Sequence, residues 1–488
     1  MKSRNNILAA AALFTLGLAG TATAQIGQPL IHDPSTIVEN NGKYYTFGTG
    51  GASLMSEDGW SWKGGNDVAQ RPGGGAAPDA MKIGDRYLIA YGATGGGLGG
   101  GHNGRILTMW NKTLDPKSPD FKYTTAVIVA YTDGYEDSDA IDPSLFLDPK
   151  TGRLWLTFGT YYGFSRIVEL DPKTGFRVKS NKEVDIAVDC EATDLIYKDG
   201  WYYLLATHGT CCDGANSTYN IVVGRSKKVK GPFLDNIGRS MLEGGGKSVF
   251  TAAGTVVGPG HFGRYIVDNG IEKMSCHFEA DLELGGKSTL GIRPLLWKNG
   301  WPHAGNLIKD GTYKIESERR GFGLELTVEF VRMGGGGMRM GGGGAPAVSQ
   351  VVPKQKLSDV NASWPTGTIK VRMAEYLFRP HQRWSIVALN DRPGYLGGPY
   401  FKIVIEGTNR ALAATANAEL ITVPEFSGAP EQLWRIDQLT DGTYRIMPKA
   451  VPGSTKNYAL MSVSDAMPSL GEFFDAQNDN YKWNLIAD

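Results

Sequence analysis

Hairpin-like patterns of alternating apolar and polar residues repeat along the N-terminal part of the chain. In one copy an acid, Glu191, precedes a run of apolar and aromatic alternation, which a Lys-Asp-Gly turn at 198–200 interrupts. Period-two alternation bounded by turn residues predicts a β-hairpin. Further copies of the pattern begin at His32, Ala77 and Ile141. We interpret three of these four hairpins as presenting an acid at the same place.

The acidic positions recur with the period that is typical of propeller blades. Roughly 45 to 65 residues separate successive members of the series Asp33, Asp79, Asp142 and Asp194 or its neighbour Glu191. A fifth, more divergent unit spans residues 254–277. We therefore predict an all-β protein in which residues 25–302 form a five-bladed β-propeller. The innermost strand of each blade would begin beside a central channel, so that equivalent residues converge there.

Composition and charge agree with this fold and argue against several functions. The chain has 488 residues, long enough for two domains, and its 66 glycines and 10% aromatic residues suit short strands joined by tight turns. Because 50 basic residues balance 50 acidic ones, nothing favours nucleic acid or an anionic membrane as a partner. Four cysteines are too few for a disulfide scaffold. We expect Cys190 and Cys276 to be buried thiols. Adjacent cysteines such as Cys211 and Cys212 rarely bond to each other, and the sequence leaves their redox state open.

Residues 1–24 have the features of an export signal. Lys2 and Arg4 give a basic start, residues 7–18 form an apolar run too short to span a bilayer, and Ala22-Thr23-Ala24 matches a cleavage site. No other stretch is apolar for long enough to cross a membrane. We expect a secreted or periplasmic protein that is a monomer and does not insert into a membrane.

The C-terminal part of the chain has a repeat of its own. Tryptophans 50 and 49 residues apart end the runs Gln382-Arg383-Trp384, Gln432-Leu433-Trp434 and Tyr481-Lys482-Trp483. Three copies of a Gln-x-Trp-like strand resemble the ricin-B-type β-trefoil, a sugar-binding module, so we assign residues 303–488 to a β-trefoil-like, carbohydrate-binding domain. Repeated tryptophans normally fill the core of such a fold, and they indicate architecture more directly than sugar binding. The glycine-rich run 334–344 is expected to be a flexible insertion.

Three acids are candidates for the hydrolysis of a glycosidic bond. Such a reaction needs one protonated carboxyl group, which assists the leaving oxygen, and one ionised carboxylate, which activates water or attacks the sugar. Asp33, Asp142 and Glu191 each stand at the head of a predicted hairpin. A single Asp-Pro is ordinary turn chemistry. Because two Asp-Pro sequences occur in matching contexts and Glu191 takes the same place in a third blade, we interpret the acids as a catalytic group whose crowding raises their pKa values.

Several short motifs follow one another in a fixed order between residues 29 and 302. They are His32-Asp33-Pro34-Ser35, Ala140-Ile141-Asp142-Pro143-Ser144, Glu191, the run from Cys211 to Tyr219 with Val223-Gly224-Arg225-Ser226, Gly231-Pro232-Phe233, Gly258-Pro259-Gly260-His261, and Trp297-x-x-Gly300-Trp301-Pro302. In this order they resemble glycoside hydrolase family 43, and the Cys-Cys-x-Gly-x-x-Ser-Thr-Tyr run is similar to that of its arabinan endo-1,5-α-L-arabinosidases. The resemblance implies a five-bladed propeller that hydrolyses α-1,5-L-arabinofuranosidic bonds in arabinan with inversion at the anomeric carbon.

The same resemblance implies a role for each acid. Asp33 would be the general base that activates water, Glu191 the general acid that protonates the leaving group, and Asp142 the residue that orients Glu191 and holds its pKa up. In an inverting enzyme the carboxyl groups of Asp33 and Glu191 stand roughly 6.5 to 9.5 Å apart. His261 would reach toward a hydrated metal ion near the channel centre, calcium, whose ligands would be mostly water oxygens.

Substrate contacts are expected from aromatic faces and polar edges near the mouth of the channel. The candidates are Ser144, Tyr161, Tyr162, Cys212, Ser217, Thr218 and Tyr219. Tyr161 and Tyr162 could equally be part of the packing within a blade. Ala76 stands where the family commonly has a tryptophan, which leaves open whether the enzyme cuts within the polysaccharide or from its end.

Three alternatives stay open. The scaffold could carry an exo-acting α-L-arabinofuranosidase or a β-xylosidase instead. The propeller could be a non-catalytic carbohydrate-binding protein, although the presence of all three acids argues against this. The C-terminal domain could bind a polysaccharide other than the one that is cleaved.

Overall fold

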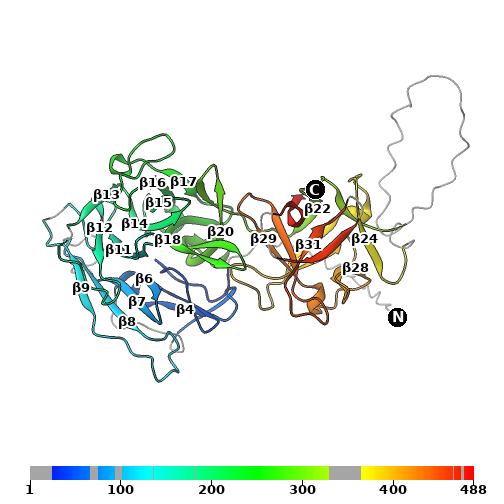
Figure 1. Cartoon of the computed structure of the whole chain (residues 1–488), viewed down its shortest axis with the longest axis horizontal. Helices are drawn as coiled ribbons and strands as arrows, with labels where there is room; N and C mark the ends of the chain where they lie inside the picture. Colours follow the sequence, from blue (N-terminus) through cyan, green and yellow to red (C-terminus); the bar gives the residue numbers. More distant parts are fainter. Residues whose placement is uncertain are drawn as a thin grey trace, which may run out of the picture.

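The computed structural model shows a molecule of two strand-built lobes (Figure 1). It describes residues 25–65, 75–93, 102–135, 137–180, 182–328, 364–464, 467–473 and 478–487. The expected export signal at 1–24 and the expected insertion at 334–344 lie outside these residues. Within them, helix is confined to the 3-10 turns η1 (Thr49–Gly51), η2 (Gly214–Asn216), η3 (Met241–Glu243), η4 (Leu282–Leu284), η5 (Pro380–Gln382), η6 (Pro430–Gln432) and η7 (Asp479–Tyr481). The predicted all-β fold is confirmed.

The N-terminal lobe is a propeller of five antiparallel blades, shown from blue to green in Figure 1. The first blade contains β1 (Ile26–Gly27), β2 (Val38–Asn40), β3 (Lys43–Phe47), β4 (Ser53–Ser56) and β5 (Ser61–Gly64). The second contains β6 (Ala76–Ile83), β7 (Arg86–Ala93), β8 (Arg105–Asn111) and β9 (Val127–Tyr131). The third contains β10 (Ser144–Leu147), β11 (Leu154–Phe158), β12 (Phe164–Leu170) and β13 (Val184–Val188).

The fourth and fifth blades complete the ring. The fourth contains β14 (Glu191–Lys198), β15 (Trp201–His208), β16 (Asn220–Ser226) and β17 (Lys247–Phe250). The fifth contains β18 (Val256–Asp268), β19 (Ile271–Asp281), β20 (Lys287–Lys298) and β21 (Trp301–Ala304). Blade faces pack on one another, so that central strands such as β11 are buried throughout. The strands β2, β6, β10, β14 and β18 are innermost, as predicted, and contacts run from β2 through β6, β10 and β14 to β18.

The N-terminal segment closes the ring between the first and the last blade. Strand β1 pairs in parallel with β5 at the outer edge of the first blade. A few residues later, Leu30 forms a bridge with Thr289 of β20 in the fifth blade. One short segment therefore ties both ends of the propeller together, and it covers strand edges that would otherwise be open.

The C-terminal lobe is a β-trefoil-like domain built from three repeated units. Its strands are β22 (Gly311–Ser317), β23 (Gly323–Leu326), β24 (Ile369–Ala374), β25 (Trp384–Ala388), β26 (Phe401–Ile405), β27 (Ala411–Ala414), β28 (Leu420–Val423), β29 (Trp434–Gln438), β30 (Tyr444–Pro448), β31 (Tyr458–Ser462), β32 (Pro468–Glu472) and β33 (Trp483–Ala487). Trp384, Trp434 and Trp483 each follow a 3-10 turn and are fully buried. Each indole N–H donates to a backbone carbonyl, those of Leu324, Leu412 and Leu460. The repeated tryptophans are core residues, as the sequence indicated.

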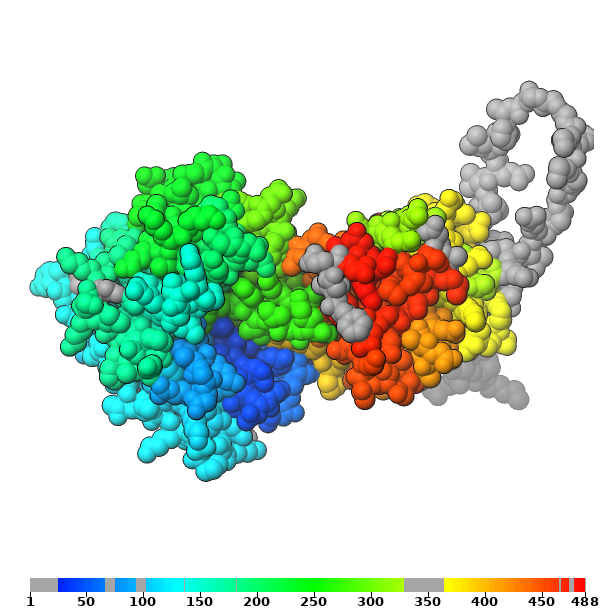
Figure 2. Space-filling model, in the orientation of Figure 1, coloured from blue at the N-terminus to red at the C-terminus, as the bar shows by residue number. Residues whose placement is uncertain are grey.

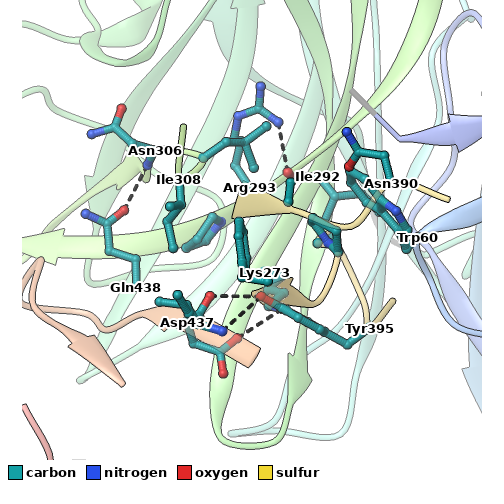
Figure 3. A pocket seen from close by; sticks show the side chains of 18 residues that line it. Trp60, Lys273, Ile292, Arg293, Asn306, Ile308, Asn390, Tyr395, Asp437 and Gln438 are labelled. Carbon is teal, nitrogen blue, oxygen red and sulfur yellow. Dashed lines mark hydrogen bonds and ion pairs between the residues drawn. The ribbon is translucent and has the colours of Figure 1, made fainter. Parts of the chain in front are cut away.

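The two lobes are in direct contact, as Figure 2 shows. Arg435 of β29 bridges them, because it pairs with Asp268 of the propeller at 2.7 Å and with Asp437 of its own strand at 2.8 Å. Lys273 of β19 lies between the same two acids, 3.3 Å from Asp268 and 3.5 Å from Asp437. A cavity of about 40 Å³ next to these charges is lined by residues of both lobes, among them Trp60 and Tyr395 (Figure 3). Buried charges join the lobes into one body.

The end of the propeller lies close to the predicted boundary. Strand β21 extends the fifth blade to Ala304, two residues beyond the expected end at 302, because it pairs with β20 as far as Leu295. The trefoil strands begin at Gly311. Among the described residues, no helix has the length and apolar character that crossing a membrane requires.

Candidate active site

One residue in each blade adopts a left-handed backbone conformation at the same point of the channel mouth. These residues are Asp33 (φ 50°), Ala77 (φ 42°), Asp142 (φ 50°), Ala192 (φ 47°) and His261 (φ 54°). Residues other than glycine rarely take positive φ values, and such strain concentrates at functional sites. The five positions mark the pseudo-fivefold symmetry of the ring, and three predicted site residues, Asp33, Asp142 and His261, occupy them.

This symmetry corrects the sequence-based alignment of the acids. Asp79 and Asp194 lie two residues after the left-handed positions Ala77 and Ala192, so they are not equivalent to Asp33 and Asp142. Glu191 lies one residue before Ala192. The alignment failed because Ala77-Pro78-Asp79 and Ala192-Thr193-Asp194 each contain an acid at nearly the expected spacing along the chain. In both, the acid stands two residues further along the inner strand than Asp33 and Asp142 do.

Asp33, Asp142 and Glu191 converge at the mouth, where their charges affect one another. Burial, followed by the charges of Glu191 and Asp33, holds the pKa of Asp142 well above its usual value. Burial also raises the pKa of Glu191, against a hydrogen bond from Tyr219 that lowers it. For Asp33 burial acts in the same direction, but the neighbouring His261 and His32 outweigh it and hold its pKa well below the usual value. The expectation that crowding raises the pKa was thus wrong for Asp33, because histidines surround it.

The carboxylate of Asp33 is held from several sides. The Thr49 hydroxyl donates to its Oδ2 at 2.6 Å, and Nδ1 of His32 lies 2.9 Å from the same oxygen. The backbone N–H of Asp33 donates to Nδ1 of His277 at 3.0 Å. Burial alone would lower the pKa of His32, but its hydrogen bonds to Asp33 and Glu279 raise it to about 10. The result is an ionised, firmly oriented carboxylate, as a general base requires.

Glu191 stands at the start of β14, where it meets a tyrosine. Tyr219, which precedes β16, donates its buried hydroxyl to Oε1 of Glu191. Tyr219 is one of the predicted substrate contacts, and the structure places it as the partner of a carboxyl group. Glu191 is only 6% exposed. A buried carboxyl group with a raised pKa is suited to carry a proton near neutral pH.

Below the acids, an arginine occupies the centre of the channel. Nη1 of Arg264 lies 2.6 Å from Asp79 and 3.5 Å from Asp194, and it donates to the hydroxyl of Ser144 at 3.1 Å. Burial raises the pKa of Asp194 to about 7, although Arg264 lowers it. The predicted substrate contact Ser144 therefore faces the channel interior and its arginine. Sequence reasoning missed Arg264 because arginine in an inner strand has no local motif.

The remaining predicted contacts lie on the loops around the mouth. Tyr161 and Tyr162 are about half exposed, at 52% and 44%, and their loop begins where Gly159 donates to the carbonyl of Ile141, next to Asp142. Thr218 is exposed, whereas Ser217 is buried and donates to the carbonyl of Thr210 at 2.7 Å. Ser217 thus stabilises its own loop. The two tyrosines, Thr218 and Cys212 are the exposed candidates.

Cys211 and Cys212 form a disulfide at the mouth, which the sequence analysis did not expect. The backbone at Cys212 takes a left-handed conformation (φ 64°), and its N–H donates to Oε2 of Glu279 at 3.0 Å. This unusual backbone geometry, anchored by a buried acid, brings the two adjacent sulfurs together. Cys190 and Cys276 are buried free thiols, as expected.

The surroundings of His261 bear on the expected calcium ion. His261 is buried, its Nδ1 lies 3.6 Å from Asp33, and its backbone N–H donates to Thr207. It borders a cavity of about 10 Å³ that is also lined by Asp142, Ser144 and Asp194. Carboxylate and hydroxyl oxygens are the donors that calcium prefers, so the chemistry of the lining fits the ion. The cavity has room for a single water-sized group.

Comparison with known families identifies both lobes. Residues 26–302 match the family model described as glycosyl hydrolases family 43, and residues 380–462 match the one described as ricin-type beta-trefoil lectin domain-like. The propeller match covers the whole ring of blades from β1 to β21. The second match begins at η5 and spans the repeated Gln-x-Trp strands β25 and β29.

Among characterised relatives, an extracellular endo-α-(1→5)-L-arabinanase of Bacillus subtilis is 31% identical over 318 residues, which are 60% of this chain and 94% of that protein. An extracellular exo-α-(1→5)-L-arabinofuranosidase of Cellvibrio japonicus is 32% identical over 245 residues, 46% of this chain and 68% of that protein. The crystal structure of an exo-1,5-α-L-arabinanase from a bovine ruminal metagenomic library superposes with a TM-score of 0.52 at 32% identity, covering 57% of this chain and 97% of that one.

A solved endo-arabinanase from Bacillus licheniformis has a TM-score of 0.51 at 29% identity and covers 57% of this chain and 99% of its own. These relatives differ in whether they are named endo or exo. The family model spans more than half of the chain, and it includes every acid at the channel mouth. The chain therefore belongs to the glycosyl hydrolases family 43.

Proposed function

We propose that the propeller hydrolyses α-1,5-L-arabinofuranosidic bonds in arabinan with inversion at the anomeric carbon. The observation that carries this proposal is that the pKa values of two carboxyl groups in one site are shifted in opposite directions. The pKa of Asp33 is held low, while the pKa of Glu191 is raised. Two titratable groups whose surroundings separate their pKa values are the mark of an acid and a base in one reaction. Relatives named as arabinanases supply the substrate class.

In the proposed reaction, the Asp33 carboxylate accepts a proton from a water molecule, whose oxygen forms a bond to the anomeric carbon. Glu191 gives its proton to the glycosidic oxygen as the bond from that oxygen to the anomeric carbon breaks. The sugar is released with inverted configuration, and the two carboxyl groups regain their starting states by proton exchange with solvent. Asp142 lies near Glu191 and orients it together with Tyr219, while burial and the charge of Asp33 hold the pKa of Glu191 up.

We also propose endo action as the main mode of cleavage. The relative in Bacillus subtilis that aligns over 94% of its length is named an endo-arabinanase. Exo action is the second candidate, because a relative of similar identity and one superposed structure carry exo names. Both would use the same acids, and they would differ in loops that close one end of the groove.

The test is a product profile over time on linear and branched arabinan, with xylan as a control. Endo action predicts a spread of arabino-oligosaccharides early in the reaction. Arabinose, or one short oligosaccharide of fixed length, from the start would move the assignment to exo action. Release of xylose would favour a β-xylosidase, and no product from any of the three would contradict hydrolysis altogether.

Calcium is part of the proposal as an electrostatic component of the site. His261 would hold the ion, and water would supply most of its other ligands, with the carboxylates of Asp142 and Asp194 at the border of the same cavity. A bound divalent cation would stabilise negative charge near the acids. We further propose export to the periplasm or the medium, on the basis of the sequence at 1–24 and of relatives that are named extracellular.

A further inference from the structure

A buried carboxylate, Glu279 of β19, stands at the centre of a hydrogen-bond network behind the proposed base. Its Oε1 lies 2.9 Å from Nε2 of His32 and 3.1 Å from Nε2 of His277. Its Oε2 accepts the backbone N–H of Cys212 at 3.0 Å. Glu279 is 4% exposed, so water contributes little to its solvation. A buried carboxylate that three groups approach is an organised structure, because burial without partners would be costly.

The protons of the two histidines follow from their partners. Nδ1 of His277 accepts the backbone N–H of Asp33, so the ring proton of neutral His277 is on Nε2 and points at Glu279. Both ring nitrogens of His32 face carboxylates, Asp33 at 2.9 Å and Glu279 at 2.9 Å, so both donate. All three groups that meet Glu279 are therefore donors.

The same geometry argues against a metal ion in this cluster. The side chains of His32, His277 and Glu279 are close enough to ligate one ion. A histidine ligand, however, offers an unprotonated nitrogen to the metal. Nε2 of His277 carries the proton, because the other ring nitrogen accepts from Asp33. The hydrogen bonds already account for the convergence of the three side chains.

The network reaches Asp33 along two routes. One leads from Glu279 through His32 to the carboxylate Oδ2 of Asp33. The other leads from Glu279 through His277 to the backbone N–H of Asp33. The left-handed backbone at Asp33 is strained, and such a conformation persists only where its surroundings determine it. Glu279 fixes both the side chain and the main chain of the residue through two stacked imidazole rings, whose centroids are 4.4 Å apart.

Glu279 also connects the base to a substrate-facing loop. Cys212 is exposed at the mouth, and its N–H is anchored on the oxygen of Glu279 that the histidines leave open. A change at Glu279 therefore acts on the base and on the loop from one point.

We propose that Glu279 is a positioning residue for the base Asp33, acting through His32 and His277, and that it ties the Cys211–Cys212 loop to the same frame. This inference rests on the proposed hydrolysis, in which Asp33 activates water. Glu279 touches no reacting atom. Its role is to keep the Asp33 carboxylate on the line along which water attacks.

The test is Glu279→Gln, with Glu283→Gln as the matched control on the exposed turn that follows β19. The amide keeps the size of the side chain but places an NH2 group against one of three donors, so one hydrogen bond is lost and two donors face each other. We expect kcat on arabino-oligosaccharides to fall about 10- to 100-fold, as for a misplaced catalytic group, with little change in KM. The control is expected to stay within twofold of the wild type.

An aryl arabinofuranoside with a good leaving group separates this role from effects on Glu191. A weakened acid is partly bypassed by a good leaving group, whereas a misplaced base is not. The loss in Glu279→Gln should therefore be as large on the aryl substrate as on the oligosaccharide. A loss that vanishes on the aryl substrate, a change confined to KM, or kcat within twofold of the wild type would each overturn the inference.

His32→Gln provides a second variant, and the double variant tests the connection. If Glu279 acts through His32, the two losses in kcat combine to clearly less than their product, and full additivity argues against the connection. A crystal structure of Glu279→Gln gives a readout that does not depend on turnover. If the Asp33 carboxylate and the Cys212 loop have the same positions as in the wild type, the inference is refuted. A wild type and control that cleave neither substrate would instead refute the proposed hydrolysis.

Discussion

At the scale of single residues, the site is defined by how histidines, a tyrosine and burial shift the pKa values of three acids. His32 and His261 hold the pKa of Asp33 well below its usual value, whereas burial raises the pKa values of Asp142 and Glu191. Asp33 and Asp142 could be located from the sequence because their Asp-Pro motifs recur, and Glu191 because it stands at the head of a similar hairpin. His261, which lowers the pKa of Asp33, comes from the fifth blade, and Tyr219 lies 28 residues after its partner Glu191, so no local pattern reveals these contacts.

Tyr219→Phe tests the bias on Glu191. The tyrosine hydroxyl stabilises the charged carboxylate and lowers the pKa of Glu191. Without that hydrogen bond the pKa of Glu191 rises, so the acid stays protonated to higher pH. We expect the alkaline limb of the kcat/KM profile to move to higher pH. The control is Tyr203→Phe in β15 of the fourth blade. It removes a buried hydroxyl that donates to the backbone carbonyl of Gly300 at 2.8 Å. An unchanged or lowered alkaline limb in Tyr219→Phe would contradict the assignment.

Removal of calcium tests the proposed role of His261. If the ion supports the charge distribution at the mouth, the chelated enzyme should lose most of its activity and recover it when calcium is added back. Elemental analysis of the purified protein should find about one calcium ion per chain under this proposal. Full activity after exhaustive chelation, together with no bound calcium, would count against the ion and leave His261 as a neighbour of Asp33 alone.

At the scale of elements, the repeated strand patterns predicted the fold. They did not predict which residues occupy equivalent positions in the blades. Gln-x-Trp runs located the trefoil because each indole fills the core and donates to a carbonyl. Blade assignment from acids was less exact, since Asp79 and Asp194 lie on the next inward position and bind Arg264 instead. The sequence also gave no sign of β1, two residues long, although this strand closes the ring.

Gly27→Ala tests the closure of the ring. Gly27 has φ 85°, and an added Cβ would clash with the backbone carbonyl of Trp62 on β5. We expect the free energy of unfolding to fall by about 1 to 3 kcal/mol. Gly42→Ala is the control, because it has φ 75° but open space around its Cβ position, so it carries backbone strain without the clash. Denaturant unfolding measures both, and an equal loss in the two variants would show that β1 adds little to the ring.

At the scale of the whole molecule, buried charges make the propeller and the trefoil a single body. The sequence indicated two domains but not their attachment, because Asp268 of the propeller lies 167 residues before its partner Arg435 of the trefoil. Arg445 adds a further ion pair to Asp437 at 2.7 Å and donates to the carbonyl of Asn269 in the propeller. The trefoil is therefore fixed against the fifth blade, and any sugar it binds would be held in a set direction from the active site.

Arg435→Met tests this attachment. The variant removes the only side chain that, in the described residues, pairs at under 3 Å with acids of both lobes. Loss of one partner of a buried ion pair costs about 3 to 5 kcal/mol. We expect calorimetry to show one unfolding transition in the wild type and an earlier, broadened or split transition in the variant. A variant that unfolds as the wild type does would show that the lobes are held by other contacts.

The central claim is that Asp33 and Glu191 hydrolyse the arabinofuranosidic bond by a single displacement. The most direct measurement is proton NMR of an α-1,5-linked arabino-oligosaccharide during the first minutes of hydrolysis, before the product anomers equilibrate. Our account predicts that the new reducing end appears first as the β-anomer, because water attacks opposite the leaving oxygen. First appearance of the α-anomer would mean retention through a covalent intermediate and would contradict the roles assigned to the two acids.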